Sequence, residues 1–278
     1  MTSLLTVLLI LCGGLVAGLI GSLTGLGGGM IIVPLLTLVF HMPIPEAVGI
    51  SLFGVIATST GAAPRFVGTG LNNVRVALFL QVAASSGALA GAVLAHHLSA
   101  RFLFMLFGVV LGYSAIMSFL PKHAEIGGVP QDSPLARRLR LGSRYQQGGV
   151  WVDYHVTAVL PGFVVMLGAG LLSALLGIGS GAFKVLALDR LMRLPFRVST
   201  ATSNFMIGVT AATSVGYYLS NGDVSPILAA AVVFGVLAGA YAGGHLVKVL
   251  PVKILRRLFG TVLLLIALQM LVKGVMNL

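Results

Sequence analysis

Two glycine-rich clusters interrupt apolar runs that would otherwise each form a single membrane helix. The clusters are Gly25-Leu26-Gly27-Gly28-Gly29 and Gly177-Ile178-Gly179-Ser180-Gly181. Glycine in a helix costs about 1 kcal/mol relative to alanine. Non-helical backbone at membrane depth persists only where protein buries it or where it lines a wet cavity. One cluster alone would favour close helix packing, but paired breaks are typical of transporter sites, so we predict that both clusters border a bound ligand.

A short apolar segment follows each cluster, over residues 30–40 and 182–191. The first has about eleven residues, or roughly 16 Å of helix, which is too short to cross a bilayer comfortably. Its N-terminus is therefore expected inside the membrane, where unsatisfied N–H groups carry roughly half a positive charge. Two such ends directed at one central point favour an anion as the ligand.

Lys184 is unusual because it lies three residues after the second cluster, among apolar neighbours. An unpaired cation at membrane depth costs a few kcal/mol. Two interpretations stay open: the lysine binds the substrate anion or takes up a proton, or its ammonium group extends to a nearby interface. Ile32 occupies the corresponding place in the first half of the chain, so the repeat described below does not require a cation there.

Hydroxyl and amide side chains are dense in residues 199–204 and recur in residues 51–60. Such groups line an anion path by hydrogen bonding, or they bond to their own helix or to a neighbouring helix. The candidate substrate-binding residues are Gly25, Gly27, Gly28, Gly29, Ser51, Thr58, Gly177, Gly179, Ser180, Gly181, Lys184, Thr202, Ser203 and Asn204.

The composition is that of an integral membrane protein. The 278 residues are 58 % hydrophobic and 8 % charged, with a mean hydropathy of +1.06, whereas soluble domains carry about 25 % charged residues. The net charge of +11 arises from Lys and Arg between apolar runs, as the positive-inside rule requires, so no nucleic-acid partner is expected. Cys12 is the single cysteine, which excludes an intrachain disulfide and a cysteine metal cluster. We expect no metal and no cofactor.

Ten apolar segments make up most of the chain. They cover residues 4–23, 30–40, 47–63, 76–95, 102–120, 155–176, 182–191, 200–219, 226–247 and 254–271. We predict an all-α membrane protein with about eight full membrane helices and two short segments after the glycine breaks. Residues 121–150 form the one long polar stretch. A short amphipathic helix on anionic lipid at residues 135–141 and a solvated loop are equally open for it.

The two halves are repeats related by a shift of 152 residues. Glycine, proline, hydroxyl and aromatic residues coincide at this single offset without a gap. The matched pairs include Gly18 with Gly170, Gly25 with Gly177, Gly27 with Gly179, Gly29 with Gly181, Pro43 with Pro195, Ser51 with Ser203, Thr58 with Thr210 and Gly87 with Gly239. An internal repeat of this kind predicts two similar structural units. The expected divisions are residues 1–120 for repeat one, 121–150 for a cytoplasmic linker and 151–278 for repeat two.

The basic residues favour inverted halves. If each glycine cluster only bends one helix, each half crosses four times and Lys and Arg divide evenly between the two sides. If the chain turns back at each cluster, each half has five segments and the halves are inverted. One side then carries fourteen basic residues and the other only Arg101 and Lys273. This asymmetry predicts a cytoplasmic linker and both termini outside.

Enzyme motifs are incomplete in this sequence. Ser180 lacks the flanking glycines of G-x-S-x-G, because Ile178 and Ala182 occupy those positions. The pattern Gly177-x-Gly179-x-x-Ala182 follows an apolar helix rather than a strand, so it does not predict a dinucleotide site. No H-E-x-x-H occurs. We therefore expect no enzymatic activity.

The paired glycine clusters resemble those of the sulfite exporter TauE/SafE family of bacterial and archaeal permeases. The stretch Pro43…Ala47-Val48-Gly49-Ile50-Ser51-Leu52 is also similar to that family, and residues 199–205 resemble one of its sub-groups. The similarity covers almost the whole chain outside the linker. The chain departs from the family pattern at Ile50, where Thr is common, at Ser180, which replaces a frequent Gly, and in its longer linker.

The resemblance implies transport, usually export, of sulfite or small organosulfonates across the cell inner membrane. A permease for another solute, an anion channel and a membrane scaffold remain open alternatives. The expected partners are a small anionic substrate and the lipid bilayer. The sequence leaves open whether the chain is a monomer or a homodimer.

Overall fold

The computed structural model describes residues 4–24, 27–62, 70–119, 131–147, 149–246 and 252–276. It is 79 % helical. The elements are α1 (Leu4–Thr24), α2 (Gly29–Pro34), the π-helical turn η1 (Leu35–Val39), α3 (Ile44–Ala62), α4 (Val74–Ala95), α5 (Ala100–Phe119), α6 (Pro134–Arg138), β1 (Ser143–Gln147), β2 (Val150–Tyr154), α7 (Val159–Leu176), α8 (Gly181–Leu186), the π-helical turn η3 (Ala187–Leu191), α9 (Phe196–Ser220), α10 (Pro226–Leu246) and α11 (Val252–Met276).

Local sequence explains where several helices begin. Pro195 precedes α9 and Pro226 is the first residue of α10, where the N–H that proline lacks would have no partner inside the helix. The Asn73 side chain caps α4 by accepting a hydrogen bond from the N–H of Val76.

Each short helix after a glycine break continues into a π-helical turn. Pro34 ends α2, but Leu186 ends α8, so proline is not required for this turn.

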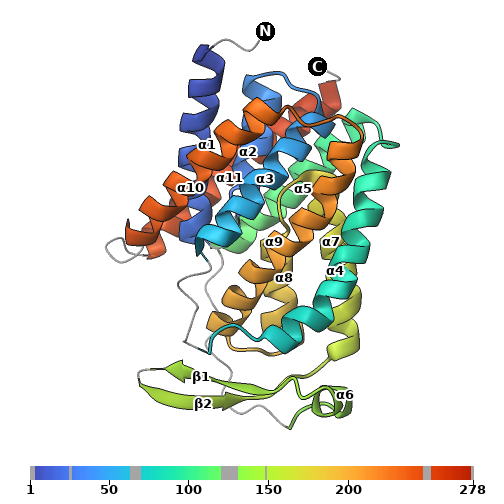
Figure 1. Cartoon of the computed structure of the whole chain (residues 1–278), viewed down its shortest axis with the longest axis vertical. Helices are drawn as coiled ribbons and strands as arrows, with labels where there is room; N and C mark the ends of the chain where they lie inside the picture. Colours follow the sequence, from blue (N-terminus) through green and yellow to red (C-terminus); the bar gives the residue numbers. More distant parts are fainter. Residues whose placement is uncertain are drawn as a thin grey trace.

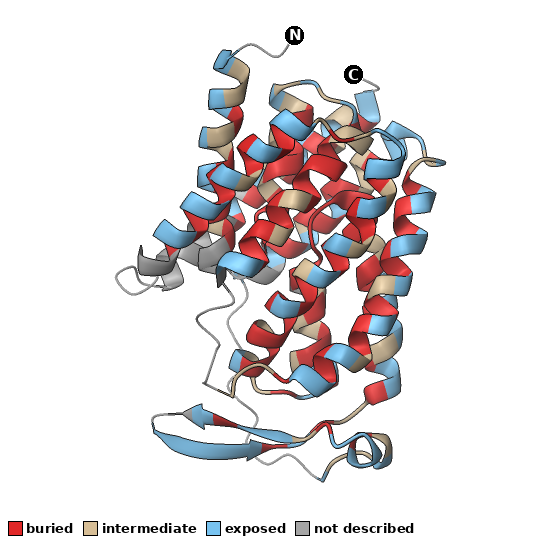
Figure 2. Cartoon of the chain, in the orientation of Figure 1, coloured by how far each residue is buried: buried red, intermediate tan, exposed pale blue. Residues whose placement is uncertain are grey.

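Five of the described helices are long and apolar enough to cross a membrane. They contain the windows Leu4–Gly21, Ile44–Gly61, Val74–Ala95, Val159–Leu176 and Pro226–Gly243, and shorter apolar helices cover Gly29–Val39, Ala100–Ile116 and Leu263–Met276. The outer helix faces carry large exposed apolar side chains, whereas the interior of the bundle is buried (Figure 2). The protein is therefore a multi-pass, helical membrane protein.

The helices form one bundle with both termini at the same end (Figure 1). The β1–β2 hairpin and α6 lie at the opposite end. Helix α1 starts at the end that carries the termini, whereas α7 starts at the hairpin end. Helix α1 packs along α10, and α7 packs along α4; α3 packs along α9, and α5 along α11.

Small residues allow two of these helix pairs to approach closely. A Cβ added to Gly18 of α1 would overlap the carbonyl oxygen of Val236, and one added to Gly170 of α7 would overlap that of Ala84. Since both partners differ by 152 positions, the α1–α10 and α7–α4 contacts use matching residues. The close packing of small residues is typical of helix association in membranes.

The polar segment between α5 and α7 contains a helix and a β-hairpin. Helix α6 overlaps the range 135–141 considered for an amphipathic helix, but it begins at Pro134 and ends at Arg138. Strands β1 and β2 pair antiparallel, with Ser143 opposite Tyr154 and Tyr145 opposite Val152. No strand is expected from the sequence, and the hairpin corrects that expectation. The linker boundary predicted at residue 150 falls at the first residue of β2.

Candidate functional site

The two glycine breaks have backbone conformations that favour glycine. The φ angles are +85° at Gly27, +65° at Gly177 and +71° at Gly179, and Ser180 adopts +48° although it is not glycine. These values lie in the left-handed region, which side chains with a Cβ rarely adopt. Both apolar runs are therefore interrupted as the sequence predicts. Gly25 lies outside the described residues.

The two breaks meet in the centre of the bundle. A Cβ on Gly29 would overlap the carbonyl oxygen of Gly177, so the two chain segments touch backbone to backbone. The hydroxyl of Ser51, from α3, donates to that same carbonyl at 2.8 Å. The N–H of Gly28 donates to Thr58 Oγ1 at 3.4 Å. Five of the predicted residues therefore form one contiguous group that α3 holds in place.

The second break also packs against α3 and α9. A Cβ on Gly179 would lie 2.8 Å from Ile207 of α9 and 2.9 Å from Val55 of α3. The hydroxyl of Ser203 donates to the carbonyl oxygen of Gly181 at 3.3 Å. The crossing of α3 and α9 thus positions both breaks.

Ser180 is fully buried, and its hydroxyl has no hydrogen-bond partner among the described residues. An unpaired buried hydroxyl costs about 1–3 kcal/mol. Ser180 therefore combines an unfavourable backbone conformation with an unsatisfied polar group. Local strain of this kind concentrates at functional sites.

Lys184 lies one turn further along α8, since its N–H donates to the carbonyl oxygen of Ser180. The side chain is fully buried, which is not the geometry of a lysine that extends to an interface. Its Nζ donates to Thr210 Oγ1 at 2.6 Å and to the carbonyl oxygen of Met206 at 3.4 Å. Within the described chain, no carboxylate forms an ion pair with it.

Two of the predicted residues make structural contacts away from the breaks. Thr202 Oγ1 accepts from the N–H of Asn73 at 3.0 Å, which joins α9 to the start of α4. The Nδ2 of Asn204 lies 3.5 Å from the carbonyl oxygen of Ser59, whose hydroxyl donates to the carbonyl oxygen of Asn204 at 2.6 Å. These bonds connect α3 to α9 and match the helix-joining alternative for the hydroxyl-rich segment.

Gln81 and Thr210 belong to the lysine environment but are absent from the predicted set. The Gln81 side-chain amide lies 3.1 Å from Thr210 Oγ1, the oxygen that accepts from Lys184. Two signals were available in the sequence. Thr210 is the repeat partner of Thr58, and Gln81 is an amide inside an apolar span.

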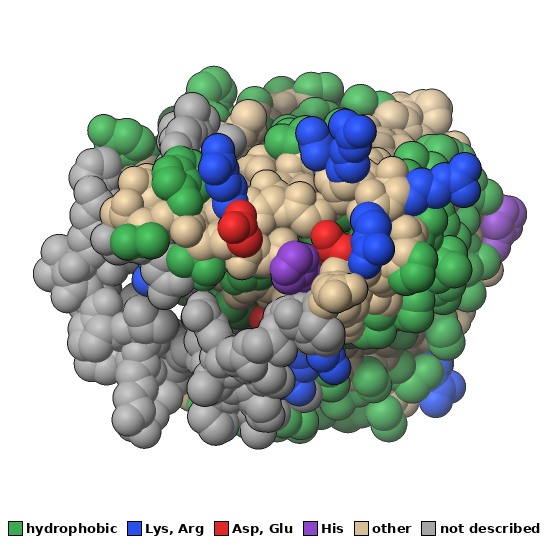
Figure 3. All heavy atoms as spheres, turned by 90° about the horizontal axis from the view of Figure 1, so that it is seen from below, with side chains coloured by type: hydrophobic (Ala, Val, Ile, Leu, Met, Phe, Trp, Pro, Cys, Tyr) green, Lys and Arg blue, Asp and Glu red, His purple; other side chains and the backbone are tan. Residues whose placement is uncertain are grey.

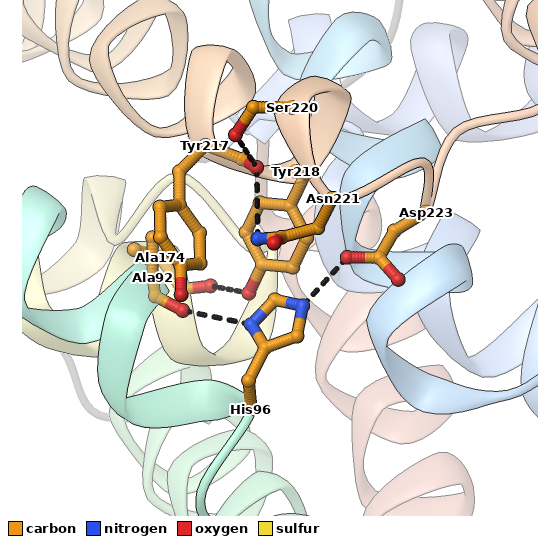
Figure 4. A network of polar contacts seen from close by, with 8 residues as sticks. All are labelled: Ala92, His96, Ala174, Tyr217, Tyr218, Ser220, Asn221 and Asp223. Atoms are coloured by element: carbon orange, nitrogen blue, oxygen red, sulfur yellow. Dashed lines mark hydrogen bonds and ion pairs between the residues drawn. The ribbon is translucent and has the colours of Figure 1, made fainter.

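A second polar cluster lies at the C-terminal end of α4, where His96 caps the helix (Figure 4). His96 Nε2 is 2.6 Å from Asp223 Oδ2, and His96 Nδ1 is 3.1 Å from the carbonyl oxygen of Ala92. Both ring nitrogens thus face oxygen atoms of the protein. Tyr218 packs against the ring at 5.4 Å between centroids and donates to the carbonyl oxygen of Ala174 at 2.8 Å. This cluster joins α4, α7 and the α9–α10 connection.

The profile of the sulfite exporter TauE/SafE family matches residues 10–270, which is nearly the whole chain. The protein belongs to the sulfite exporter TauE/SafE family. Probable membrane transporter protein YdhB of Bacillus subtilis is 29 % identical over 253 residues, covering 91 % of this chain and 94 % of the relative. Probable membrane transporter protein YunE of the same organism is 27 % identical over 271 residues, covering 95 % and 97 %. No solved structure matches.

The family match and the two related transporters identify this chain as a membrane transporter of the TauE/SafE family. The resemblance noted in the glycine clusters is thereby confirmed. In this TauE/SafE protein the two clusters touch each other between the halves of the chain, and a buried lysine with no carboxylate partner among the described residues lies one turn beyond the second cluster.

Proposed function

We propose that this TauE/SafE transporter exports small sulfur-containing anions such as sulfite or organosulfonates across the cell inner membrane, with no enzymatic step. The observation that carries the proposal is the fully buried ammonium group of Lys184, which lacks a carboxylate partner in the described chain. A buried charge is costly unless it is paired. A bound anion supplies that pairing, and the unsatisfied hydroxyl of Ser180, one turn away, offers an additional donor.

We further propose that the halves are inverted repeats that move by alternating access. Matching glycine contacts in the α1–α10 and α7–α4 pairs support a two-fold relation. The opposite starting ends of α1 and α7 support its inversion (Figure 1). Each half contributes one glycine break to the centre, so a tilt of one half against the other would expose the site to alternate sides.

In this arrangement the hairpin end faces the cytoplasm and both termini face outward. Lys and Arg side chains gather at the hairpin end (Figure 3). Their described members are Arg75, Arg137, Arg138, Arg140, Arg144, Arg190, Arg193 and Arg197. A positive surface on the side from which export starts also attracts anions to the entrance.

The test is a transport assay with purified protein in liposomes, together with a thermal-shift screen against sulfite, small sulfonates, thiosulfate, sulfate and carboxylates. Binding to the folded state alone raises apparent stability. We expect saturable, gradient-dependent flux of sulfite or a sulfonate. Flux that does not saturate would indicate a channel. Flux of a different solute alone would identify that solute as the substrate. The absence of both flux and binding would indicate a membrane scaffold.

A further inference from the structure

A cavity of about 600 Å³ lies at the hairpin end, between α6 and the β1–β2 hairpin. Three arginines line it, Arg137, Arg140 and Arg144, together with Asp153 and Tyr154. Figure 3 shows this end of the molecule, where basic side chains surround acidic and histidine side chains. The volume is within the range of about 300–1,000 Å³ that is typical of small-molecule sites.

The three guanidinium groups have no carboxylate partner in the described part of the chain. The Asp132 carboxylate, which also lines the cavity, has other partners: it accepts from the N–H of Val156 at 2.7 Å and lies 3.5 Å from Nδ1 of His155, which is another lining residue. The Arg144 guanidinium lies over the Trp151 ring, with 5.3 Å between its Cζ and the ring centroid. A cation–π contact of this kind holds the guanidinium near the ring and leaves N–H groups available for an oxyanion.

We propose that this cavity binds a phosphate-like oxyanion with two or more negative charges, at a site separate from the central one. Arginine presents a planar fork of donors that matches the oxygens of such groups. The three forks outnumber the two carboxylates of the lining, Asp132 and Asp153, and several forks can bind the several oxygens of a multivalent anion. The same chemistry is presented by a soluble phosphate compound and by the headgroup of an anionic lipid, and the experiment below separates these sources.

Asn73, the N-cap residue of α4, connects the proposed site to the membrane helices. The Nδ2 of Asn73 donates to the hydroxyl of Tyr154, which lines the cavity, and to the carbonyl oxygen of Leu141, both at 2.8 Å. The guanidinium of Arg75 donates to the carbonyl oxygen of Arg140 at 3.0 Å. Burial raises the pKa of Tyr154, so its hydroxyl stays protonated at physiological pH. The cavity is therefore a fixed part of the molecule rather than a surface of a loose linker.

The test uses the full-length protein, purified in detergent, with pyrophosphate and inorganic phosphate as probes in thermal-shift and calorimetric titrations. We expect saturable binding of pyrophosphate, weakened about ten-fold by Arg140→Gln and likewise by Arg137→Gln, because each substitution removes a charge-assisted contact. Arg138→Gln is the matched control, since Arg138 is an exposed arginine of α6 that does not line the cavity.

A second set of samples identifies the source of the anion. The same variants are placed in nanodiscs of phosphatidylcholine with and without phosphatidic acid. Retention of phosphatidic acid that depends on Arg140, without pyrophosphate binding, supports the site with a lipid headgroup as its ligand. Equal binding of both probes by the wild-type, Arg137→Gln, Arg140→Gln and Arg138→Gln proteins, or no binding, overturns the proposal. Lys184→Met should leave this binding unchanged, so failure here and failure of the central site give different results.

Discussion

Lys184 uses two of the three N–H groups of its ammonium within the protein. They point to Thr210 Oγ1 and to the carbonyl oxygen of Met206. An incoming oxyanion can accept from the third and offset the charge at the same time. Because Thr210 also contacts Gln81, helices α4, α8 and α9 share one buried polar group. At the residue scale, the group formed by Lys184, Thr210 and Gln81 is the best candidate for responding to a bound anion.

Replacing Lys184 by methionine should weaken anion binding by about ten- to a hundred-fold, the equivalent of a charge-assisted contact of roughly 1.5–3 kcal/mol. The free energy of unfolding without ligand should stay the same or rise, because the variant no longer buries an unpaired cation. Isothermal titration with the anion found in the screen measures the first effect and thermal unfolding the second. Lys273→Met is the control, since Lys273 donates to the carbonyl oxygen of Thr37 in a different part of the bundle. Unchanged affinity with raised stability would show that the anion is held without the lysine.

Two substitutions at Ser180 separate strain from binding. Ser180→Gly removes both the hydroxyl and the cost of a left-handed conformation, so we expect stability to rise by about 1 kcal/mol while anion affinity falls. Ser180→Ala keeps the strained backbone and removes only the unpaired hydroxyl, and it should lower affinity to a similar extent. Parallel titrations and unfolding curves distinguish these effects. Full affinity in both variants would exclude the hydroxyl from the site.

At the scale of elements, the close approach of the two breaks makes Gly29 intolerant of any side chain. A Cβ there would overlap the carbonyl oxygen of Gly177 and crowd Val55. Gly29→Ala should destabilise the fold by about 1–3 kcal/mol and abolish transport in liposomes. Gly216→Ala is the control, because a Cβ at that exposed position of α9 has no atom within 4 Å. Normal flux through Gly29→Ala would mean that the two breaks do not need to touch.

Most helices could be predicted from the sequence because length and apolarity determine a membrane span. The expected span at residues 76–95, for example, corresponds to α4 at Val74–Ala95. The two glycine breaks were also predictable, since glycines repeat at one offset. The partner of Lys184 was not, because it depends on how α9 is rotated relative to α8. Likewise, Asp223 is 127 residues from His96, and no local pattern connects them.

The hairpin was missed although its signals are present. Residues 143–154 contain two polar, aromatic strands around Gly148-Gly149, a pair typical of hairpin turns. Among the strand residues whose burial the structure describes, only Tyr145 and Tyr154 are buried, so the apolar alternation that usually identifies a strand is weak. The prolines, glycines and basic residues of residues 121–150 left a short amphipathic helix and a solvated loop equally open instead.

At the scale of the whole molecule, the helix contacts pair corresponding elements of the two halves. The contact of α3 with α10 has its counterpart in that of α9 with α4, while α3 with α9 and α5 with α11 are contacts between equivalent helices. In the proposed inverted repeat, equivalent helices that pack against each other lie on the axis that relates the halves. The glycine breaks meet beside the α3–α9 pair, so the proposed site lies where the two halves would shift relative to each other in the proposed alternating-access mechanism.

Inverted halves with an odd number of crossings require the linker and the C-terminus to face opposite sides of the membrane. A compartment-sensitive reporter inserted at Gly149, an exposed turn position whose Cβ would have no atom within 4 Å, should give a cytoplasmic signal. The same reporter fused after Leu278 should give an external signal, because the basic residues of the hairpin end hold that face inside. A transport assay of each fusion verifies that the reporter leaves the fold intact. If both reporters gave a cytoplasmic signal, each half would cross an even number of times. The glycine breaks would then be bends within single helices, and alternating access between inverted halves would be wrong.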